Sequence, residues 1–163
     1  MAAYLLKERG MDIHGVYMEN WKKSSLTPRC TTEEDRRDAL KVATHFGIPF
    51  TVLNFQKEYE EKVIDYFYRE YENGRTPNPD VMCNKEIKFK ALLKAIKQLG
   101  GSKIATGHYA RVAGHDGAFQ LLKGVDANKD QTYFLHTITQ DQLAHTLFPV
   151  GHLTKPEVRQ IAK

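Results

Sequence analysis

The feature that most constrains this chain is a stiff loop that carries a cysteine and runs into a helix. Residues 75–89 read RTPNPDVMCNKEIKF. The two prolines fix φ and push the residue before each of them out of the α region. Apolar residues then recur at helical spacing from Ile87 to Ile96, and Gly100 ends the run. We therefore predict that Cys83 lies where an extended loop meets the N-terminus of a helix.

A cysteine at that position is a candidate nucleophile. The positive end of the helix dipole favours the thiolate over the thiol, and Lys85 adds a positive charge nearby. Asp80, three residues earlier, is close enough in sequence to give or take a proton. A lone cysteine is usually an inert core residue. The loop, the acid and the helix start together favour a working nucleophile.

Composition limits the class of protein. A chain of 163 residues with 41% hydrophobic and 27% charged residues suits one soluble domain with a core. The sequence has no bilayer-length apolar run and no signal peptide, so we expect no membrane partner. Two cysteines cannot make a disulfide framework, which favours the cytoplasm, or the mitochondrial matrix in a eukaryote. A net charge of +4 weakly favours a nucleic-acid partner.

Helical and strand patterns alternate along the chain, which predicts an α/β fold with a parallel sheet flanked by helices. Strands are expected over residues 11–18, 49–55 and 103–106, and a hairpin is expected to pair 109–112 with 119–122. Helices are expected over 2–9, 31–46, 57–72, the run after Cys83, 129–134, 141–147 and from 154 onward.

Ligands of such sheets bind beyond the carboxyl ends of the strands. Met18 ends one predicted strand, and Gly107 and His108 follow another, so all three are expected on the same rim as Cys83. The loop after Met18 carries Trp21, which could form a base-stacking rim or a plain surface loop with the basic residues Lys22, Lys23 and Arg29.

Five segments closely resemble the tRNA-specific 2-thiouridylases, and the resemblance runs essentially from end to end. They are residues 15–21 (GVYMENW), 74–89, 105–111 (ATGHYAR), 129–135 (KDQTYFL) and 148–151 (FPVG). The resemblance implies the adenine nucleotide α-hydrolase-like α/β fold. It also implies that residues 1–163 are part of an N-terminal catalytic domain of the N-type ATP pyrophosphatase group.

Enzymes of that family use ATP, with Mg²⁺, to adenylate the 2-oxygen of the wobble uridine in tRNA. Sulfur from the persulfide of a donor protein then replaces the activated oxygen. The resemblance implies that Cys83 attacks the persulfide and that Asp80 is the acid or base. The implied partners are tRNA and a sulfur-relay donor protein, and no metal site formed by protein residues is implied.

The resemblance also implies three sets of contacts. Met18 and Gly107 match positions that approach the nucleotide. The target base would touch Asn78, Pro79 and Asp80, and the tRNA would touch Lys129, Asp130 and Gln131.

The resemblance leads us to expect that the chain is incomplete at both ends. The family's phosphate loop would precede Met1, and the second family cysteine, which carries the persulfide, would follow Lys163. Cys30 aligns with a non-catalytic family position. We therefore expect the 163 residues alone neither to bind ATP tightly nor to complete thiolation.

Simpler interpretations stay open for the same residues. Met18 fits a core residue at a strand end, Gly107 a turn, and His108 a hydrogen-bonded structural group; Lys129 and Asp130 fit a solvated helix start. Two functions remain: the enzyme, and a non-catalytic adenine-nucleotide or RNA-binding module that kept the fold and lost the chemistry. The missing phosphate loop favours the module for the isolated chain, whereas the pair of Asp80 and Cys83 favours the enzyme for its parent protein.

Overall fold

The computed structural model describes residues 1–21, 31–115 and 117–163. Lys22, Lys23, Arg29 and Cys30 lie outside the described residues. The elements in chain order are α1 (Ala2–Glu8), β1 (Gly15–Glu19), α2 (Thr32–Phe46), β2 (Phe50–Asn54), α3 (Gln56–Tyr59), the π-helical segment η1 (Glu60–Ile64), α4 (Asp65–Glu72), α5 (Pro79–Met82), the π-helical segment η2 (Cys83–Leu92), α6 (Leu93–Gln98), β3 (Ile104–Ala105), β4 (Ala110–His115), β5 (Ala118–Lys123), the 3₁₀ turn η3 (Thr132–Phe134), α7 (Gln140–Ala144), β6 (Thr146–Leu147) and α8 (Lys155–Ile161).

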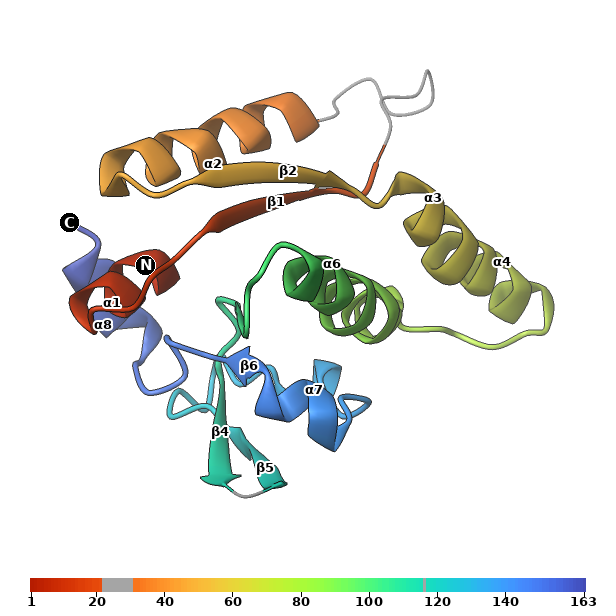
Figure 1. Cartoon of the computed structure of the whole chain (residues 1–163). Helices are drawn as coiled ribbons and strands as arrows, with labels where there is room; N and C mark the ends of the chain where they lie inside the picture. Colours follow the sequence, from red (N-terminus) through yellow and green to blue (C-terminus); the bar gives the residue numbers. More distant parts are fainter. Residues whose placement is uncertain (22–30, 116) are drawn as a thin grey trace.

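The described strands form three two-stranded sheets, of which two are parallel. β1 pairs with β2 in the register Gly15 to Phe50, β3 pairs with β6, and β4 and β5 form the predicted antiparallel hairpin. Figure 1 shows α2 and α6 on opposite sides of the β1–β2 pair. The predicted α/β fold, with parallel strands and flanking helices, is therefore confirmed.

Two features of the sheet differ from the prediction. The parallel strands form two separate pairs instead of one sheet, and β3 and β6 are two residues long. The segment 141–147 was expected to be helical throughout, but α7 ends at Ala144 and Thr146–Leu147 pairs with β3. A two-residue strand is too short to show a hydrophobic period, so the sequence pattern could not reveal β6.

Helix ends follow the predicted signals. Gly47, Gly74 and Gly100 adopt φ of 60°, 70° and 84° within two residues of the ends of α2, α4 and α6, where the left-handed conformation ends a helix. At the start of α8, Thr154 and Glu157 form a complete capping box. These local interactions fix where each connecting loop begins.

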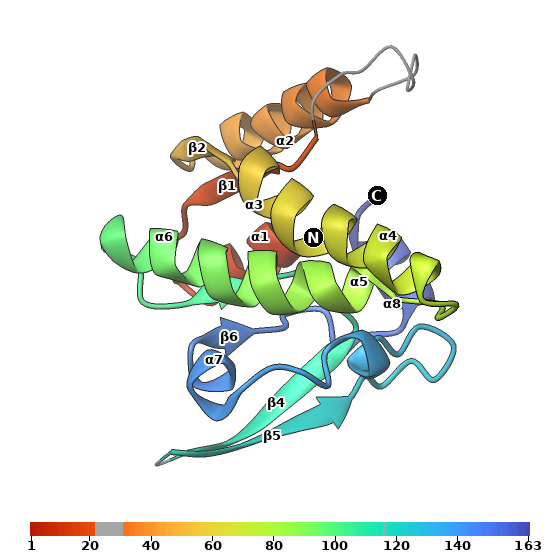
Figure 2. The same ribbon diagram turned by 90° about the vertical axis from the view of Figure 1, so that its right-hand side faces the viewer.

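The main hydrophobic core surrounds the helix that carries Cys83. Ile87, Phe89 and Leu135 are fully buried in it, and Val63 joins them from η1. A second, smaller cluster contains Tyr109, Val150 and Val158 of α8, and Leu5 of α1 packs against it. Figures 1 and 2 accordingly show the N- and C-termini close together.

Candidate active site

The helix that carries Cys83 begins earlier than the sequence pattern suggested. Asn78 is its N-cap, and the Asn78 Oδ1 atom accepts hydrogen bonds from the backbone N–H groups of Asp80 (3.0 Å) and Val81 (3.3 Å). Pro79 occupies the first turn, where its missing N–H has no consequence. α5, η2 and α6 then follow one another without a break, as Figure 2 shows. Cys83 therefore lies one turn inside the helix and not at its N-terminus.

The environment of Cys83 corrects the expectation of a readily formed thiolate. Its side chain is 8% exposed and belongs to the hydrophobic core that contains Val63 and Ile87. Burial raises the pKa of the Cys83 thiol, Lys88 lowers it in part, and the carboxylate of Asp80 raises it further. The net effect is a raised pKa, because removing a thiolate from water costs more free energy than the attraction of one partly screened cation restores. The sulfur and the acid are nevertheless neighbours, as predicted.

Tyr59 joins Asp80 and Cys83 from the neighbouring element α3. Burial raises the pKa of Tyr59 to about 12, and the negative charges of Cys83 and Asp80 act in the same direction. The Tyr59 ring packs against the core cluster and lies 5.1 Å from the ring of Trp21, centroid to centroid. Trp21 is 50% exposed and Asp80 is exposed. A buried thiol thus has an acid and a phenol near it, and the phenol ring lies against an exposed indole.

Lys88 and His108 belong to the same surroundings. The Lys88 charge acts on both the Cys83 thiol and the His108 imidazole. The His108 ring lies 6.1 Å from the rings of Phe89 and Phe148, and its Nδ1 atom is 2.8 Å from the Thr106 hydroxyl. Burial, followed by the charge of Lys88, lowers the pKa of His108 to about 4. At neutral pH His108 is uncharged and hydrogen-bonded, as the structural interpretation predicted.

The residues predicted to approach a nucleotide lie at strand ends. Met18 pairs with Leu53 next to the end of β1, and its partly buried side chain packs against the same core cluster as Cys83. Gly107 follows β3, and a Cβ atom built there would enter open space. Next to β1, the side-chain oxygen of Asn20 is buried and has no partner among the described residues. The empty space at Gly107 and the unsatisfied Asn20 oxygen fit a polar ligand such as a nucleotide.

The predicted tRNA segment divides into one exposed residue and two that hold the fold together. Lys129 is exposed. The Asp130 carboxylate accepts hydrogen bonds from the Gly124 backbone N–H (2.9 Å) and the Thr132 hydroxyl (2.7 Å). The Gln131 side-chain oxygen accepts a bond from the Tyr109 N–H at 3.0 Å. Although burial alone would raise the pKa of Asp130, its hydrogen bonds bring it below the usual value. Asp130 and Gln131 therefore orient the segment that presents Lys129.

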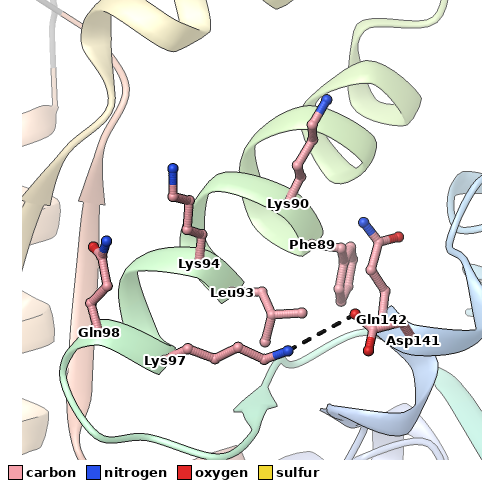
Figure 3. A pocket seen from close by; sticks show the side chains of 8 residues that line it. All are labelled: Phe89, Lys90, Leu93, Lys94, Lys97, Gln98, Asp141 and Gln142. Atoms are coloured by element: carbon pink, nitrogen blue, oxygen red, sulfur yellow. Dashed lines mark ion pairs between the residues drawn. The ribbon is translucent and has the colours of Figure 1, made fainter.

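A groove lies between the helix that follows Cys83 and α7, and Figure 3 shows its lining. Its volume is about 460 Å³. Lys97 pairs with Asp141 across it at 3.9 Å, and Lys90 is held by Glu86 at 2.7 Å. The full lining is Phe89, Lys90, Leu93, Lys94, Lys97, Gln98, Asp141 and Gln142. The groove carries more positive than negative side chains and lies on the same continuous helix as the cysteine.

None of the helices in the described part of the chain has the length and apolarity needed to cross a membrane. The same residues contain no group of three or more His, Cys, Asp or Glu side chains that would hold a metal ion.

The parallel strand pairs, the flanking helices and the polar groups at the strand ends define an α/β protein of the adenine nucleotide α-hydrolase-like class. The family model described as "tRNA methyl transferase HUP domain" matches residues 1–163, so the chain belongs to this family.

Similar curated proteins carry one name. Proteins called tRNA-specific 2-thiouridylase MnmA from Bacillus thuringiensis (strain Al Hakam), Bacillus cereus (strain Q1) and Bacillus anthracis are each 54% identical to the chain over all 163 residues. The alignment covers 100% of the chain and 44% of each relative. The chain therefore spans less than half the length of the relatives it matches.

Two residues of the site were not predicted from sequence. Tyr59 falls within the helix predicted over 57–72 and Lys88 within the run after Cys83, and neither was singled out. In an α-helix the neighbours of Cys83 are three and four residues away, at Glu86 and Ile87. In a π-helix the hydrogen bonds run to the fifth residue, which brings Lys88 near Cys83. The sequence carries no signal for that change of period.

Proposed function

We propose that this chain is part of the catalytic domain of a tRNA 2-thiouridylase, which replaces the 2-oxygen of the wobble uridine with sulfur at the expense of ATP. The observation that carries the proposal is the adjacency of Asp80, Cys83 and Tyr59 at the start of one capped helix. The same stretch belongs to a chain that is 54% identical throughout to proteins of that name. A cytoplasmic location and a sulfur-relay donor protein are parts of the same proposal.

ATP would be held on its adenosine side by Met18 and Gly107, at the ends of β1 and β3. Bound ATP supplies the adenylyl group that turns the uridine 2-oxygen into a leaving group. Room for a ligand at Gly107 and an unsatisfied acceptor at Asn20 support this placement. Mg²⁺ would accompany the phosphates of ATP, and the described residues contribute no cluster of ligands for it.

The target base would enter at the helix start. Asn78 and Pro79 fix the backbone there, and the exposed Asp80 carboxylate can exchange a proton with the base. Trp21 and Tyr59 offer an aromatic edge beside it, and recognition of unstacked RNA bases commonly uses such surfaces. Lys129 and the groove lysines are placed to meet phosphates.

Cys83 would release the sulfur. Its thiolate attacks the inner sulfur of the persulfide carried by the second family cysteine, so that a disulfide forms between the two cysteines and the bond to the outer sulfur breaks. The outer sulfur leaves as hydrosulfide and replaces the activated oxygen at C2, which departs with AMP. A thiol reductant then cleaves the new disulfide and restores Cys83.

The test measures 2-thiouridine by mass spectrometry of digested tRNA after incubation with ATP and a persulfide donor. It uses protein expressed from the complete gene, because the chain spans 44% of the length of the relatives. We expect Cys83→Ser to abolish product and Asp80→Asn to reduce it by about 10²-fold or more. The matched control, Cys30→Ser, changes the other cysteine of the chain and should retain activity.

The competing function predicts a different result. A non-catalytic nucleotide- or RNA-binding module would bind ATP or tRNA without forming 2-thiouridine, whichever cysteine is present. Wild-type protein that binds both ligands but forms no product would therefore overturn the proposal in favour of the module. Product formation by Cys83→Ser would overturn the assigned role of the cysteine.

A further inference from the structure

The site poses a question about how Cys83 becomes reactive. A thiolate is the attacking species in persulfide chemistry. Cys83 is 8% exposed, and both its burial and the neighbouring Asp80 favour the neutral thiol. The helix dipole contributes less than expected, because Cys83 lies one turn inside the helix and the dipole's effect is confined to the first turn. Some other group must offset these costs.

Lys88 is placed to do so. It follows Cys83 by five residues within η2, and π-helical hydrogen bonding joins residues at that spacing. The Lys88 side chain is partly buried, and no carboxylate among the described residues lies within ion-pair distance of it. Its neighbours on the helix differ in this respect, because Lys85 and Lys90 both reach Glu86, at 3.9 and 2.7 Å.

A partly buried ammonium group without a carboxylate partner is unusual, because long cationic side chains normally extend to water or pair with an acid. The packing explains why Lys88 stays near the cysteine. Phe89, the next residue, is fully buried against His108 and Phe148. Cys83 belongs to the same core cluster as Phe89. The charge of Lys88 accordingly acts on both the Cys83 thiol and the His108 imidazole.

We propose that Lys88 is a positioning residue that stabilises the thiolate of Cys83 when the thiol attacks the persulfide. The proposal rests on the nucleophilic role given to Cys83 above. Four ionisable groups are linked to Cys83 electrostatically: Asp80 and Lys88 on the same helix and Tyr59 on α3 directly, and His108 after β3 through Lys88. Tyr59 and His108 are uncharged at neutral pH. Among these four, Lys88 supplies the positive charge that compensates the thiolate.

The experiment measures how fast Cys83 is alkylated by iodoacetamide as a function of pH. It uses the protein expressed from its complete gene, and peptide mass spectrometry follows the modification of Cys83 itself. In Lys88→Gln the alkylation curve should move to higher pH, and the rate constant at neutral pH should fall about three- to tenfold, since one pKa unit corresponds to tenfold in thiolate. Lys88→Arg keeps the charge and should restore the wild-type curve.

Lys90→Gln is the matched control, because it removes the same charge from the same helix at an exposed side chain held by Glu86. It should leave the curve unchanged. An unchanged curve in Lys88→Gln, or an equal shift in Lys90→Gln, would overturn the proposal. Thermal unfolding of each variant distinguishes a change of charge from a loss of fold. Should Lys88→Arg fail to restore the curve while remaining folded, the charge of Lys88 is not the cause and the proposal is also wrong.

The result does not depend on the proposed function. Alkylation reports the coupling of Lys88 to Cys83 whether or not the protein modifies tRNA. A shifted alkylation curve together with thiolation by Cys83→Ser would retain the coupling and reject the nucleophile. An unchanged curve together with inactive Cys83→Ser would reject the coupling and retain Cys83 as the nucleophile.

Discussion

At the scale of single residues, the site is built from ionisable side chains that are largely shielded from water. Cys83 and Tyr59 favour their neutral forms, and His108 is neutral far into the acid range. In this setting a nearby charge shifts the equilibrium between the neutral and the charged form of a side chain more than it would at the surface, because fewer water molecules screen it. Asp80, at the exposed edge, is the acid in contact with solvent.

His108 makes this dependence measurable through stability. Its pKa is about 4 in the folded protein and 6.5 when unperturbed, so the unfolded chain binds a proton that the folded protein refuses. The contribution of His108 is therefore fully favourable above pH 6.5 and is lost as the pH falls toward about 4. We expect wild-type protein to lose roughly 2 kcal/mol over this range from this group alone.

Urea denaturation at the two ends of the range tests this expectation. His108→Asn keeps a polar group near the Thr106 hydroxyl but cannot take up the proton, so its free energy of unfolding should fall less on acidification. His152→Gln removes an exposed histidine and should behave like wild type. Equal losses in wild type and His108→Asn would contradict the burial-driven shift of His108.

At the scale of elements, the junction between loop and helix could be predicted from the sequence, but the hydrogen-bonding period of that helix could not. Pro77, Pro79 and the apolar residues after Cys83 indicated a stiff loop followed by a helix, and the structure has both. The helix begins at Pro79 because Asn78 caps it, and a polar residue before a proline is a start signal that the sequence already contained. The π-helical turns of η1 and η2 depend on tertiary packing, so no local pattern announced them.

Asn78 has two roles that substitution can separate. As the N-cap it accepts bonds from two backbone N–H groups, and the target-base proposal gives it a second contact. Asn78→Ala should destabilise the protein by about 1 kcal/mol and reduce 2-thiouridine formation. Asn78→Asp keeps a capping oxygen, so its stability should stay close to that of wild type.

Activity then decides whether Asn78 does more than cap the helix. If the Asn78 amide also contacts the base, Asn78→Asp should lose 2-thiouridine formation while its thermal unfolding is preserved. Full activity in Asn78→Asp would limit Asn78 to the cap. Wild-type stability in Asn78→Ala would contradict the capping role itself.

At the scale of the whole molecule, the parts of the site that the sequence could not place come from segments distant in the chain. His108 reaches Phe89 and Phe148, and Asn84 donates a hydrogen bond to the Phe134 carbonyl oxygen at 3.1 Å. The alternating pattern did predict that Met18 lies near the end of β1 and that Gly107 follows β3. It could not show that Asp130 and Gln131 face inward, because a turn residue can contact solvent or its own backbone with the same sequence.

The groove between α6 and α7 carries the last prediction. If tRNA phosphates lie along it, each lysine that meets one releases a counterion, and the affinity then falls with salt in proportion to the number of contacts. Lys94 has no ion-pair partner among the described residues, whereas Lys97 is paired with Asp141 at 3.9 Å. Lys94→Gln should therefore reduce the slope of log affinity against log salt by about 1, and Lys97→Gln by less.

Fluorescence polarisation of labelled tRNA over a series of salt concentrations measures these slopes. Lys41→Gln is the control, because Lys41 lies on α2 and pairs with Asp38 at 2.8 Å. Its slope should equal that of wild type. A wild-type slope for Lys94→Gln would place the tRNA elsewhere on the surface, and an equal decrease for Lys41→Gln would reduce the effect to net charge. A smaller slope for Lys94→Gln alone would show that the helix that carries Cys83 also contacts the tRNA backbone along the groove.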